Sequence, residues 1–550
     1  MSVGDRLVSR FDRGETDGYP TGLTLLSGAI AAVVLSPIVW IVMRVLQVDT
    51  DYALSIVARP MTVEILLTSL GLVAAVTGAS ICIGVPLAFL TVRTDLPFRR
   101  FWTIAVALPL VIPSYLGAFT FISAFGPGGQ LANALAPLGI ESIPPVYGFW
   151  GTTLVLTLYT YPYVFITTRA SLLSFDQQLV EAARTLGTTR WRAFRRVTLR
   201  QLLPGIASGS LLVALYTLSD FGTPSLMRLD VFTRVIFVEY NAFGRETAAM
   251  LSLQLLAITA VILSIESRIG DSSRGAYVGT GASSGSDTTV SLGAWKAPAL
   301  AFCTSIVFLC LVVPLAVLTH WLVRSPSQAT RQGVGFQWQF AINSVSVSLA
   351  AAIVCAAAAV PVAYLAARHR SRLSELFDRM TYVGYAMPGI VLGLALVFFA
   401  VYYESSVGDL LLFGVDVTPT LYQTLPLLIF AYVIRFLPQA VGSTRSSVLR
   451  VDRSLTEAAR TLGRTPAGAF RRITLPLIAP GVIGGAALVF LTTMKELPAT
   501  LVLHPTGFET LVTYIWSVRE SGYYGFAAVP ALVLIVVSGL SMVVILSQEE

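Results

Sequence analysis

The sequence predicts an all-α integral membrane protein with about twelve transmembrane helices, arranged as two parallel six-helix repeats. Three observations lead to this fold class. Of the 550 residues, 55% are hydrophobic and only 12% are charged, whereas about a quarter of the residues in soluble domains are charged. Apolar stretches long enough to cross a bilayer recur along the whole chain, and one arginine-rich segment is written twice, half the chain apart.

The apolar stretches are the expected membrane spans. A helix needs roughly 20 apolar residues to cross the hydrocarbon core, and the short alternating segments of a β-barrel are not seen in this sequence. The first stretch is too long for a signal peptide and lacks a small-residue cleavage site. The predicted spans are 22–46, 62–92, 101–125, 146–168, 202–224, 246–266, 297–322, 340–367, 377–403, 420–441, 478–500 and 524–546.

The positive charges predict the orientation of these spans. With the N-terminus in the cytoplasm, 27 of the 37 Lys and Arg residues fall in cytoplasmic segments, as the positive-inside rule expects. The C-terminus is then cytoplasmic as well. The excess of Lys and Arg on the cytoplasmic side of the lipid bilayer accounts for the net charge of +7. No nucleic-acid partner is therefore expected.

The duplicated segment shows where one repeat ends and the next begins. Residues 181–205 and 457–481 are identical at 16 of 25 positions, at an offset of 276. Parallel repeats of this kind are related by an axis along the membrane normal, and a pathway is expected between them. We therefore predict a first permease module at 1–269, a flexible Gly- and Ser-rich cytoplasmic linker at 270–296, and a second module at 297–550. Further matched pairs, at offsets of 275 or 276, are Ser69 and Ser344, Pro86 and Pro361, Arg93 and Arg368, Pro113 and Pro388, and Asp220 and Glu496.

Each copy of the segment reads as a helix, a turn and a second helix. Ser454 and Glu457 fit a capping box at the start of the first helix, with Ser174 and Gln177 as a similar start one copy earlier. The apolar residues Leu455, Ala459 and Leu462 share one face of that helix. Gly187 and Gly463 stand where a helix end favours a positive φ, and Thr188-Thr189 and Thr465-Pro466 can start the next helix.

Two interpretations of the segment are open. An amphipathic helix on the membrane surface would place its arginines against lipid phosphates. Two symmetry-related copies on one side of the membrane favour a paired docking site for a cytoplasmic partner instead. The pattern Glu-Ala-Ala, Gly and Ile/Val-x-Leu-Pro resembles the EAA loop of permease subunits of ATP-binding cassette importers. Glu457, Ala458, Ala459, Gly463, Ile473, Leu475 and Pro476 match it, as do Glu181, Ala182, Ala183, Gly187, Val197 and Leu199, with Arg200 at the usual proline.

This resemblance implies a fold, partners and roles for residues. It implies the type I importer permease fold, with coupling loops at 174–200 and 450–476 that sit in clefts of two copies of a cytoplasmic ATPase. The ATPase-coupling residues would be Glu181, Ala182, Ala183, Gly187, Glu457, Ala458, Ala459 and Gly463. An extracytoplasmic substrate-binding protein would deliver the cargo to the outer face of this permease, in the membrane of a prokaryotic cell.

Local stretches such as ALPLVIPSYLGAF and MKELPATLVLHPTGFETL resemble fused two-module permeases of ferric-iron importers. The expected cargo is therefore ferric iron or a ferric chelate. Related thiamine, polyamine and phosphonate permeases share much of this layout and remain alternatives. More distant alternatives are a secondary transporter driven by an ion gradient, which can also contain parallel repeats, and a signalling scaffold.

No enzymatic site is expected on this chain. Its two lysines, Lys296 and Lys495, do not follow the glycine pattern of a phosphate-binding loop, so ATP must be bound by the partner subunits. No cofactor is expected, and no Cys or His spacing predicts a metal site. Because charged groups inside spans are costly, Asp220 and Glu496 are candidates to line the translocation path as oxygen ligands of a hard cation. Alternatively, either residue is hydrated, or Glu496 pairs with Lys495. The prolines in the spans are expected to be hinges or packing kinks.

Overall fold

The computed structural model is almost entirely helical, which confirms the all-α fold class. A hairpin of two very short antiparallel strands, β1 (Leu411–Leu412) and β2 (Val415–Asp416), is the exception among the described residues. The structure describes residues 21–126, 129–130, 146–174, 185, 187–189, 192, 194–274, 290–324, 335–369, 371–407, 411–412, 415–416, 420–520 and 524–547.

The first module contains long helices separated by short ones. Its helices are α2 (Thr21–Leu46), α3 (Thr50–Ala58), α4 (Pro60–Arg93), α5 (Arg99–Ala105), α6 (Ser114–Phe125), α8 (Gly148–Leu173), α11 (Leu199–Ser219), α12 (Gly222–Leu226), α13 (Phe232–Asn241) and α14 (Arg245–Arg274). A 3-10 turn at Leu108–Val111 follows α5, and a π turn at Phe194–Thr198 leads into α11.

The second module repeats this order. Its helices are α15 (Lys296–Val307), α16 (Val313–Arg324), α18 (Trp338–Arg368), α19 (Arg372–Ala386), α20 (Gly389–Val407), α21 (Leu425–Arg450), α22 (Arg453–Thr461), α23 (Pro466–Ala469), α24 (Leu475–Met494), α25 (Pro498–Leu503), α26 (Leu511–Glu520) and α27 (Ala528–Ser547). π turns at Phe308–Val312 and Phe470–Thr474 join α15 to α16 and α23 to α24, and 3-10 turns at Gly293–Trp295 and Tyr524–Ala527 precede α15 and α27.

All twelve predicted spans coincide with helical segments, although not every one is a single straight helix. Among the described residues, nine helices are long and apolar enough to cross a membrane, or ten if one bent pair counts as a span. The three predicted spans not among the nine are 146–168, which is α8; 524–546, which is α27; and 101–125, which is the bent pair.

Two predicted spans are broken at prolines that the repeat relates to each other. Residues 101–125 bend by 94° at Pro113, and residues 377–403 divide into α19 and α20 before Pro388. In both places the residue before the proline, Ile112 or Met387, is extended, with ψ of 123° and 124°. A proline disfavours the helical conformation of the residue before it, which explains both breaks. Pro86 and Pro361, by contrast, lie inside α4 and α18, which continue through them.

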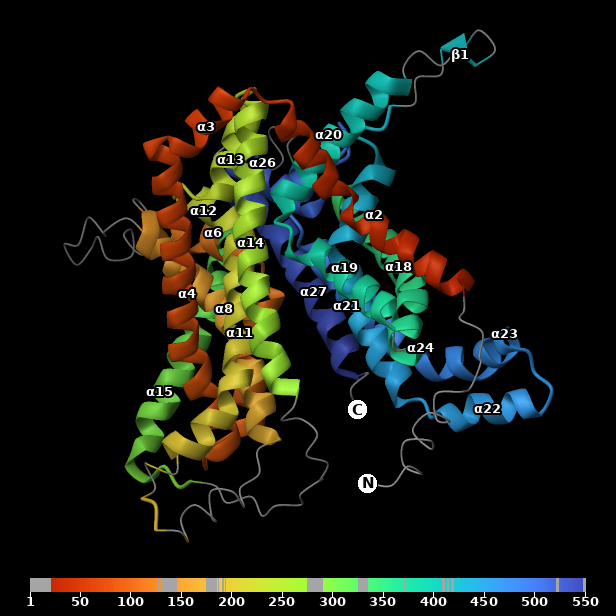
Figure 1. Ribbon diagram of the computed structural model, residues 1–550. Helices are drawn as coiled ribbons and strands as arrows, with labels where there is room; N and C mark the ends of the chain where they lie inside the picture. The colour runs from red at the N-terminus through yellow and green to blue at the C-terminus, as the bar shows by residue number, and fades with distance from the viewer. Residues whose placement is uncertain are drawn as a thin grey trace.

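The first span of each module, α2 in one and the broken helix α15–α16 in the other, contacts the other module. The ring of Trp40 in α2 lies 5.1 Å from that of Phe399 in α20, and the ring of Trp321 in α16 lies 5.2 Å from that of Phe119 in α6. Figure 1 shows α2 crossing over α18 and α19. Each of the two largest hydrophobic clusters therefore contains residues from both modules.

The segment predicted as a flexible linker is ordered at both ends. Residues 270–274 continue α14, and Val290 pairs with Thr94 in a parallel bridge. The side chain of Asp95 accepts a hydrogen bond of 2.8 Å from the N–H of Leu292 and lies 2.8 Å from Nζ of Lys296. Helix α14 and these polar contacts therefore include residues from both ends of the predicted linker, whose residues 275–289 lie outside the described residues.

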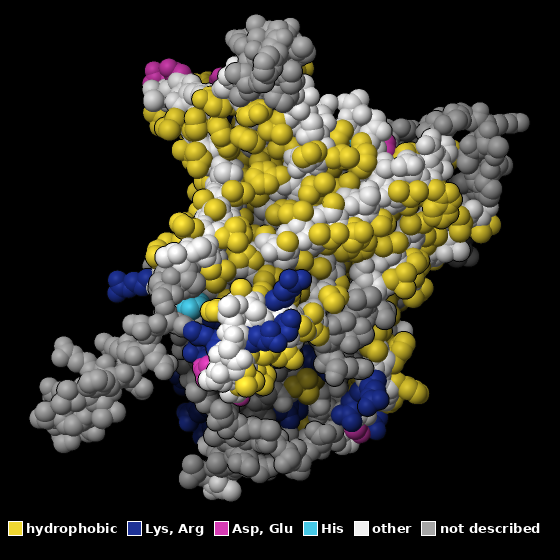
Figure 2. All heavy atoms as spheres, turned by 90° about the vertical axis from the view of Figure 1, so that its right-hand side faces the viewer, with side chains coloured by type: hydrophobic (Ala, Val, Ile, Leu, Met, Phe, Trp, Pro, Cys, Tyr) yellow, Lys and Arg dark blue, Asp and Glu magenta, His cyan; other side chains and the backbone are white. Residues whose placement is uncertain are grey.

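The surface shows how the chain meets a bilayer. Hydrophobic side chains cover the middle of the face in Figure 2, and Lys and Arg side chains gather toward one end of it. Exposed apolar side chains such as Leu67, Ile353 and Val536 lie on three of the long helices. Contiguous exposed apolar surface of this kind indicates contact with lipid.

Candidate functional site: a cavity between the modules and two exposed loops

A cavity of about 140 Å³ lies between the two modules. The cavity lies where the short helices α12 and α25 follow the long helices α11 and α24. Polar groups at these helix ends and side chains of the long helices line it. Its lining residues from the first module are Leu110, Ile112, Pro113, Ser114, Tyr115, Tyr159, Tyr163, Leu212, Leu215, Tyr216, Ser219, Asp220 and Gly222; those from the second are Tyr385, Arg435, Phe436, Gln439, Thr492, Lys495, Glu496, Leu497 and Pro498.

The structure brings Asp220 and Glu496 to this one cavity, in equivalent positions. Asp220 lies between α11 and α12, where its Oδ2 accepts a hydrogen bond of 3.2 Å from the N–H of Thr223. Glu496 lies between α24 and α25, where its Oε1 accepts one of 3.2 Å from the N–H of Ala499. Both carboxylates thus accept from an amide that a helix start leaves without an intrahelical partner.

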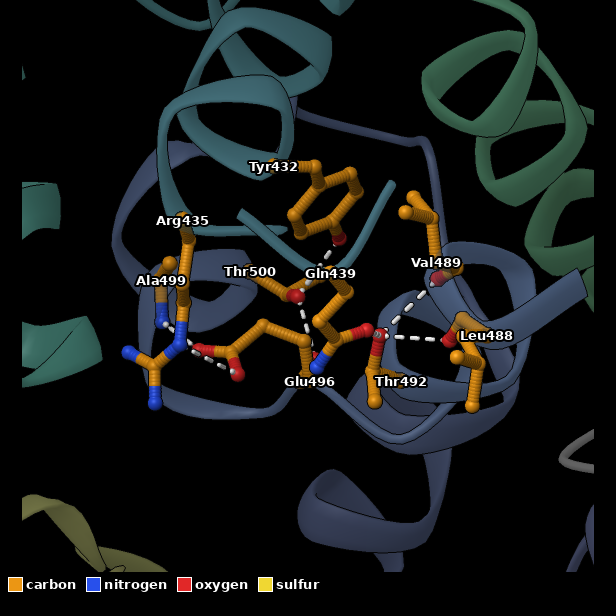
Figure 3. A network of polar contacts seen from close by, with 9 residues as sticks. All are labelled: Tyr432, Arg435, Gln439, Leu488, Val489, Thr492, Glu496, Ala499 and Thr500. Carbon is orange, nitrogen blue, oxygen red and sulfur yellow. Dashed lines mark hydrogen bonds and ion pairs between the residues drawn. The ribbon is translucent and has the colours of Figure 1, made fainter. Parts of the chain in front are cut away.

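The second module adds a buried ion pair that the first module does not repeat. Nε of Arg435 lies 3.4 Å from Oε2 of Glu496, and the side chains are only 13% and 7% exposed. Figure 3 shows the guanidinium and carboxylate side by side, with Tyr432, Gln439 and Thr492 close to them. At the position equivalent to Arg435, the first module has Tyr159. The positive charge of Arg435 therefore offsets the negative charge of Glu496. The two halves of the cavity thus differ in charge, because the first module has no cation at this position.

Asp220 has uncharged partners instead. Its Oδ1 accepts a hydrogen bond of 3.1 Å from the hydroxyl of Ser114, and that hydroxyl accepts one of 3.0 Å from the phenol of Tyr216. Two carboxylates that sequence pairs as equals are therefore held in different ways, one by hydroxyl groups and one by a guanidinium.

Lys495 makes its described contact across the module boundary. Its Nζ donates a hydrogen bond of 2.8 Å to the carbonyl of Leu110. The alternative in which Glu496 pairs with Lys495 is therefore wrong, since Arg435 takes that place. Arg435 is a basic residue inside the predicted span 420–441. Because burying a charge in a span is costly, its position alone could have indicated that it belongs to the site.

Gly389 is a further residue of the site that sequence reasoning missed. A Cβ at this position would lie 2.2 Å from Nη1 of Arg435, 2.4 Å from Oε1 of Glu496 and 2.9 Å from Cγ of Pro498. The absence of a side chain at the start of α20 therefore leaves the space in which the ion pair lies. Among the described residues, no group of three or more His, Cys, Asp and Glu side chains could hold a metal ion.

The second coupling loop forms the helix–turn–helix that its sequence predicts, with one difference. Helix α22 starts one residue before Ser454, and the cap is Asp452, whose side chain accepts a hydrogen bond of 2.9 Å from the N–H of Ser454. The predicted capping box of Ser454 and Glu457 is therefore wrong. The same hydrogen bond lowers the pKa of Asp452 below its ordinary value.

The end of that loop agrees with the sequence. Gly463 has a φ of +82°, which confirms the predicted left-handed turn. Thr465 caps α23 by accepting a hydrogen bond of 3.1 Å from the N–H of Gly468, with Pro466 at the first helical position. Glycine and proline thus occupy the positions where a helix end and a helix start favour them.

The exposed face of α22 differs from the predicted apolar face. Leu455 and Leu462 are 45% and 84% exposed, whereas Ala459 is buried. Glu457 and Ala458 are exposed too. The helix therefore turns Ala459 inward and presents two leucines, an alanine and one carboxylate outward at the edge of the molecule, where Figure 1 shows α22 and α23 projecting.

The first coupling loop is described only in part. Glu181, Ala182 and Ala183 lie outside the described residues. Gly187 has a φ of +81°, as predicted, and Thr189 accepts a hydrogen bond of 3.4 Å from the N–H of Arg192. The π turns at Phe194–Thr198 and Phe470–Thr474 lie at equivalent positions and lead into α11 and α24 in the same way. Arg200 in place of Pro476 therefore leaves the helix start unchanged.

Two helical repeats around a shared polar cavity, with a projecting helix–turn–helix on the second repeat, define a membrane permease. The chain belongs to the family of binding-protein-dependent transport system inner membrane components, whose model matches residues 80–265 and 359–548. Both matches leave out the first helix of the module. The chain is thus the multi-pass permease subunit of a binding-protein-dependent importer that works with an ATPase and a substrate-binding protein, and it is a transport subunit rather than an enzyme.

Relatives of the full length and of half the length are found. The Fe(3+)-transport system permease protein FbpB 2 of Haemophilus influenzae is 32% identical over 523 residues, which cover 95% of this chain and 97% of the relative. The ferric transport system permease protein FbpB of Actinobacillus pleuropneumoniae is 24% identical and covers 88% of this chain and 71% of its own length. A probable molybdenum ABC transporter permease of Haloferax volcanii is 30% identical over 274 residues, 48% of this chain and 96% of the relative. A half-length relative corresponds to one module, which supports the fusion of two.

Proposed function

We propose that the chain forms the translocation pathway for ferric iron or a ferric chelate. The observation that carries this proposal is the similarity to the Haemophilus influenzae Fe(3+)-transport permease, which extends over 95% of the chain. At that coverage the similarity spans both modules. In this proposal residues 1–269 and 297–550 are the two modules, and the segment between them joins them.

The cavity between the modules is proposed as part of the path, with Asp220 and Glu496 beside the cargo. The equivalent positions of the two carboxylates support this role, because parallel repeats place a pathway along their common axis. Arg435 and Lys495 bring two positive charges to the same cavity. The four charges sum to zero, so the path would offer single oxygen contacts to passing cargo rather than a strongly attractive site in which a trivalent cation would remain.

The two loops are proposed as the places where ATP hydrolysis is coupled to transport. Exposed Glu457 and Ala458, with Leu455 on the same projecting helix and Leu462 directly after it, suit an apolar cleft of a partner with a nearby basic group. Glu181, Ala182 and Ala183 would have the same role in the first loop, together with the turns at Gly187 and Gly463. One ATPase for each loop gives two copies.

The end of the molecule that carries α22 and α23 is proposed as cytoplasmic. The gathering of Lys and Arg at that end and the excess of positive charge in the corresponding segments support this orientation. Both chain termini would then be cytoplasmic, and segments at the opposite end, including α13 and α26, would receive the substrate-binding protein. ATP binding would close the ATPase subunits, move the two loops, and bias the modules between two openings.

Reconstitution tests the function. The permease would be purified from native membranes, its co-purifying ATPase identified by mass spectrometry, and the complex placed in liposomes with its binding protein. We expect ATP-dependent uptake of ferric iron and loss of ATPase recovery when Glu181→Arg and Glu457→Arg are combined. Recovery of a binding protein that holds thiamine, a polyamine or a phosphonate would overturn the choice of cargo. Uptake that follows an ion gradient without ATP would overturn the importer mechanism in this protein.

A further inference from the structure

The two long helices α4 and α18 are attached to other segments at both ends. They are related by the repeat, and each contains a serine near its first end and an arginine as its last residue, namely Ser69 and Arg93 in α4 and Ser344 and Arg368 in α18. In both helices the serine and the arginine are 24 residues apart. At 1.5 Å per residue this separation is about 36 Å, slightly more than the roughly 30 Å of the hydrocarbon core.

At the end far from the coupling loops, the serines bind the starts of two short helices. Oγ of Ser69 accepts a hydrogen bond of 3.3 Å from the N–H of Phe232, the first residue of α13. Oγ of Ser344 accepts one of 2.8 Å from the N–H of Leu511, the first residue of α26. The amide groups of a helix's first turn have no partner within their own helix, so each serine satisfies a donor that would otherwise be buried and unpaired.

A second contact strengthens this attachment in the second module. Nδ2 of Asn343 donates a hydrogen bond of 2.8 Å to the carbonyl of Glu509, two residues before α26 begins. Two neighbouring side chains of α18 therefore bind the main chain of the segment that leads into α26.

At the other end, the arginines bind carbonyls at the entry to the coupling loops. Nη2 of Arg93 donates a hydrogen bond of 2.9 Å to the carbonyl of Leu172, in the last turn of α8. Nη2 of Arg368 donates one of 2.8 Å to the carbonyl of Val451, directly after α21. The last carbonyls of a helix lack intrahelical partners, and a guanidinium also suits the negative end of a helix dipole.

In the second module this contact reaches the coupling helix itself. Only Val451 and Asp452 lie between α21 and α22. The first residue of α22, Arg453, donates a hydrogen bond of 3.3 Å from its Nη2 to the carbonyl of Arg368. The end of α18 and the start of α22 are therefore joined by hydrogen bonds in both directions.

The same end of α18 also contacts the segment that follows the coupling helix. The rings of Tyr364 and Phe470 lie 5.1 Å apart in an edge-to-face arrangement, and Phe470 begins the π turn that leads into α24. Ala367 packs with Val448, Val451 and Ile478 in a separate small apolar cluster. Both the entry and the exit of the second coupling loop thus rest on the last turn and a half of α18.

We propose that α4 and α18 connect the two faces of the membrane mechanically, and that Ser69, Arg93, Ser344 and Arg368 are the positioning residues that attach them. This inference rests on the proposed function. A movement of α22 would displace α18 as one body, and α18 would displace α26, at the face proposed to receive the substrate-binding protein. Figure 1 shows α13 and α26 at one end of the molecule and α22 at the other. Occupancy by loaded binding protein would then change ATP hydrolysis through these helices.

Both modules contain these attachments, although the residues that the serines and arginines contact differ between the modules. The serines bind a phenylalanine in one module and a leucine in the other, and the arginines bind a leucine and a valine. Because all four bonds go to main-chain groups, they do not depend on the partner side chain. Each long helix contacts one segment at each of its ends, which gives a contiguous path between the two faces. A measured change in the coupling between those faces must establish that the path is used.

The experiment measures stimulation of ATP hydrolysis by loaded binding protein in the reconstituted complex. The variants are Ser344→Ala and Arg368→Gln in one module, and Ser69→Ala and Arg93→Gln in the other. Ser346→Ala is the matched serine control, because its hydroxyl bonds to the carbonyl of Asn343 within the same helix. Arg100→Gln is the matched arginine control, since Arg100 is exposed in the first turn of α5, outside both coupling loops and the cavity.

We expect each of the four variants to lower the stimulation by about 5-fold or more, the lower end of typical allosteric coupling. Basal hydrolysis and the amount of ATPase recovered should stay as in the unaltered protein, as should both controls. Ser344→Ala combined with Arg368→Gln should lose little beyond either alone, because detaching α18 at either end already interrupts the path through it. Arg368→Lys, which retains a donor, should restore part of the stimulation.

Three outcomes overturn the inference. Full stimulation in all four variants would show that these bonds carry no coupling, while the proposed function would stand. Loss of ATPase recovery together with stimulation, without rescue by Arg368→Lys, would show a purely structural role. Equal losses in the Ser346 and Arg100 controls would show that the effect is not specific to the attachments. Failure of the unaltered protein to recover any ATPase would instead refute the proposed function.

Discussion

The ammonium group of Lys495 in the second module donates a hydrogen bond of 2.8 Å to the carbonyl of Leu110 in the first. Both residues line the cavity between the modules. A pathway between parallel repeats has to open where the repeats meet, so this bond stabilises the conformation in which they are joined. A hydrogen bond from a charged donor contributes about 1.5–3 kcal/mol.

We expect Lys495→Met to shift the conformational equilibrium by about tenfold, because about 1.4 kcal/mol corresponds to a factor of ten. Spin labels at Leu173 and Leu462, which are exposed near the two coupling loops, would report the separation of the modules by pulsed dipolar spectroscopy. A second distance should grow in population in Lys495→Met but not in Lys495→Arg, which retains a donor. Identical distance distributions in all three proteins would contradict the prediction.

The pair of Arg435 and Glu496 predicts a large energetic coupling. Removing one partner of a buried ion pair leaves an uncompensated charge and costs about 3–5 kcal/mol. We expect Glu496→Gln and Arg435→Gln each to destabilise the protein strongly, and the double variant to be less destabilised than their sum. Thermal unfolding in detergent, analysed as a double-mutant cycle, measures this coupling.

An exposed pair provides the control for that cycle. Asp230 and Arg234 are four residues apart, and their side chains are 61% and 26% exposed. Exposed pairs contribute about 0–1 kcal/mol, so a cycle of Asp230→Asn, Arg234→Gln and the double variant should show little coupling. If the buried pair shows no greater coupling than this exposed pair, Arg435 and Glu496 do not interact in the membrane as described.

Gly389 predicts an effect of a single added methyl group. A Cβ there would overlap Nη1 of Arg435 and Oε1 of Glu496, so Gly389→Ala must displace the ion pair. Overpacking of this kind costs about 1–3 kcal/mol. We expect a lower unfolding temperature and reduced uptake.

Gly78→Ala is the matched control for that substitution. Gly78 lies inside α4, and a Cβ added there would have open space around it, with no neighbouring segment within 4 Å. Alanine is favoured over glycine in a helix by about 1 kcal/mol, so this variant should be as stable as the unaltered protein or more so. An equal loss of stability in both variants would refute the steric explanation for Gly389.

Much of the fold could be predicted from the sequence because local rules and the repeat act together. Gly187 and Gly463 occupy left-handed turns, and Thr465 caps the next helix, since these roles depend only on neighbouring residues. The apolar stretches similarly located the spans. The breaks before Pro113 and Pro388 were less predictable, because Pro86 and Pro361 are tolerated within continuous helices and packing decides between the two outcomes.

The site depends on contacts that sequence order does not reveal. The equivalence of Asp220 and Glu496 follows from the repeat, and the structure does place both at one cavity. The partner of Glu496 is Arg435, on another helix, rather than the adjacent Lys495. Lys495 reaches Leu110, which is 385 residues away. The contacts of α2 and α16 with the other module could not be predicted either, because an apolar sequence does not specify which module a helix packs against.

Asp95 predicts a dependence of the linker's attachment on pH. A hydrogen bond from Lys296, and then one from the N–H of Leu292, hold the pKa of Asp95 below its ordinary value of 3.8. A carboxyl whose pKa is lower in the folded state stabilises that state fully above its unfolded pKa. The attachment should therefore be constant above about pH 4 and weaken only as the pH falls through the lowered pKa.

We expect Asp95→Ala to release the chain at 290–292 even at neutral pH, because the carboxylate accepts from the N–H of Leu292 and pairs with Lys296. Hydrogen exchange followed by mass spectrometry, corrected for the intrinsic dependence on pH, would show faster exchange of the amides of Val290 and Leu292. Lys296→Met should have a smaller effect, since it leaves the bond to Leu292 in place. Faster exchange of the unaltered protein between pH 7 and pH 5 would contradict the assignment, because Asp95 stays ionised over that range.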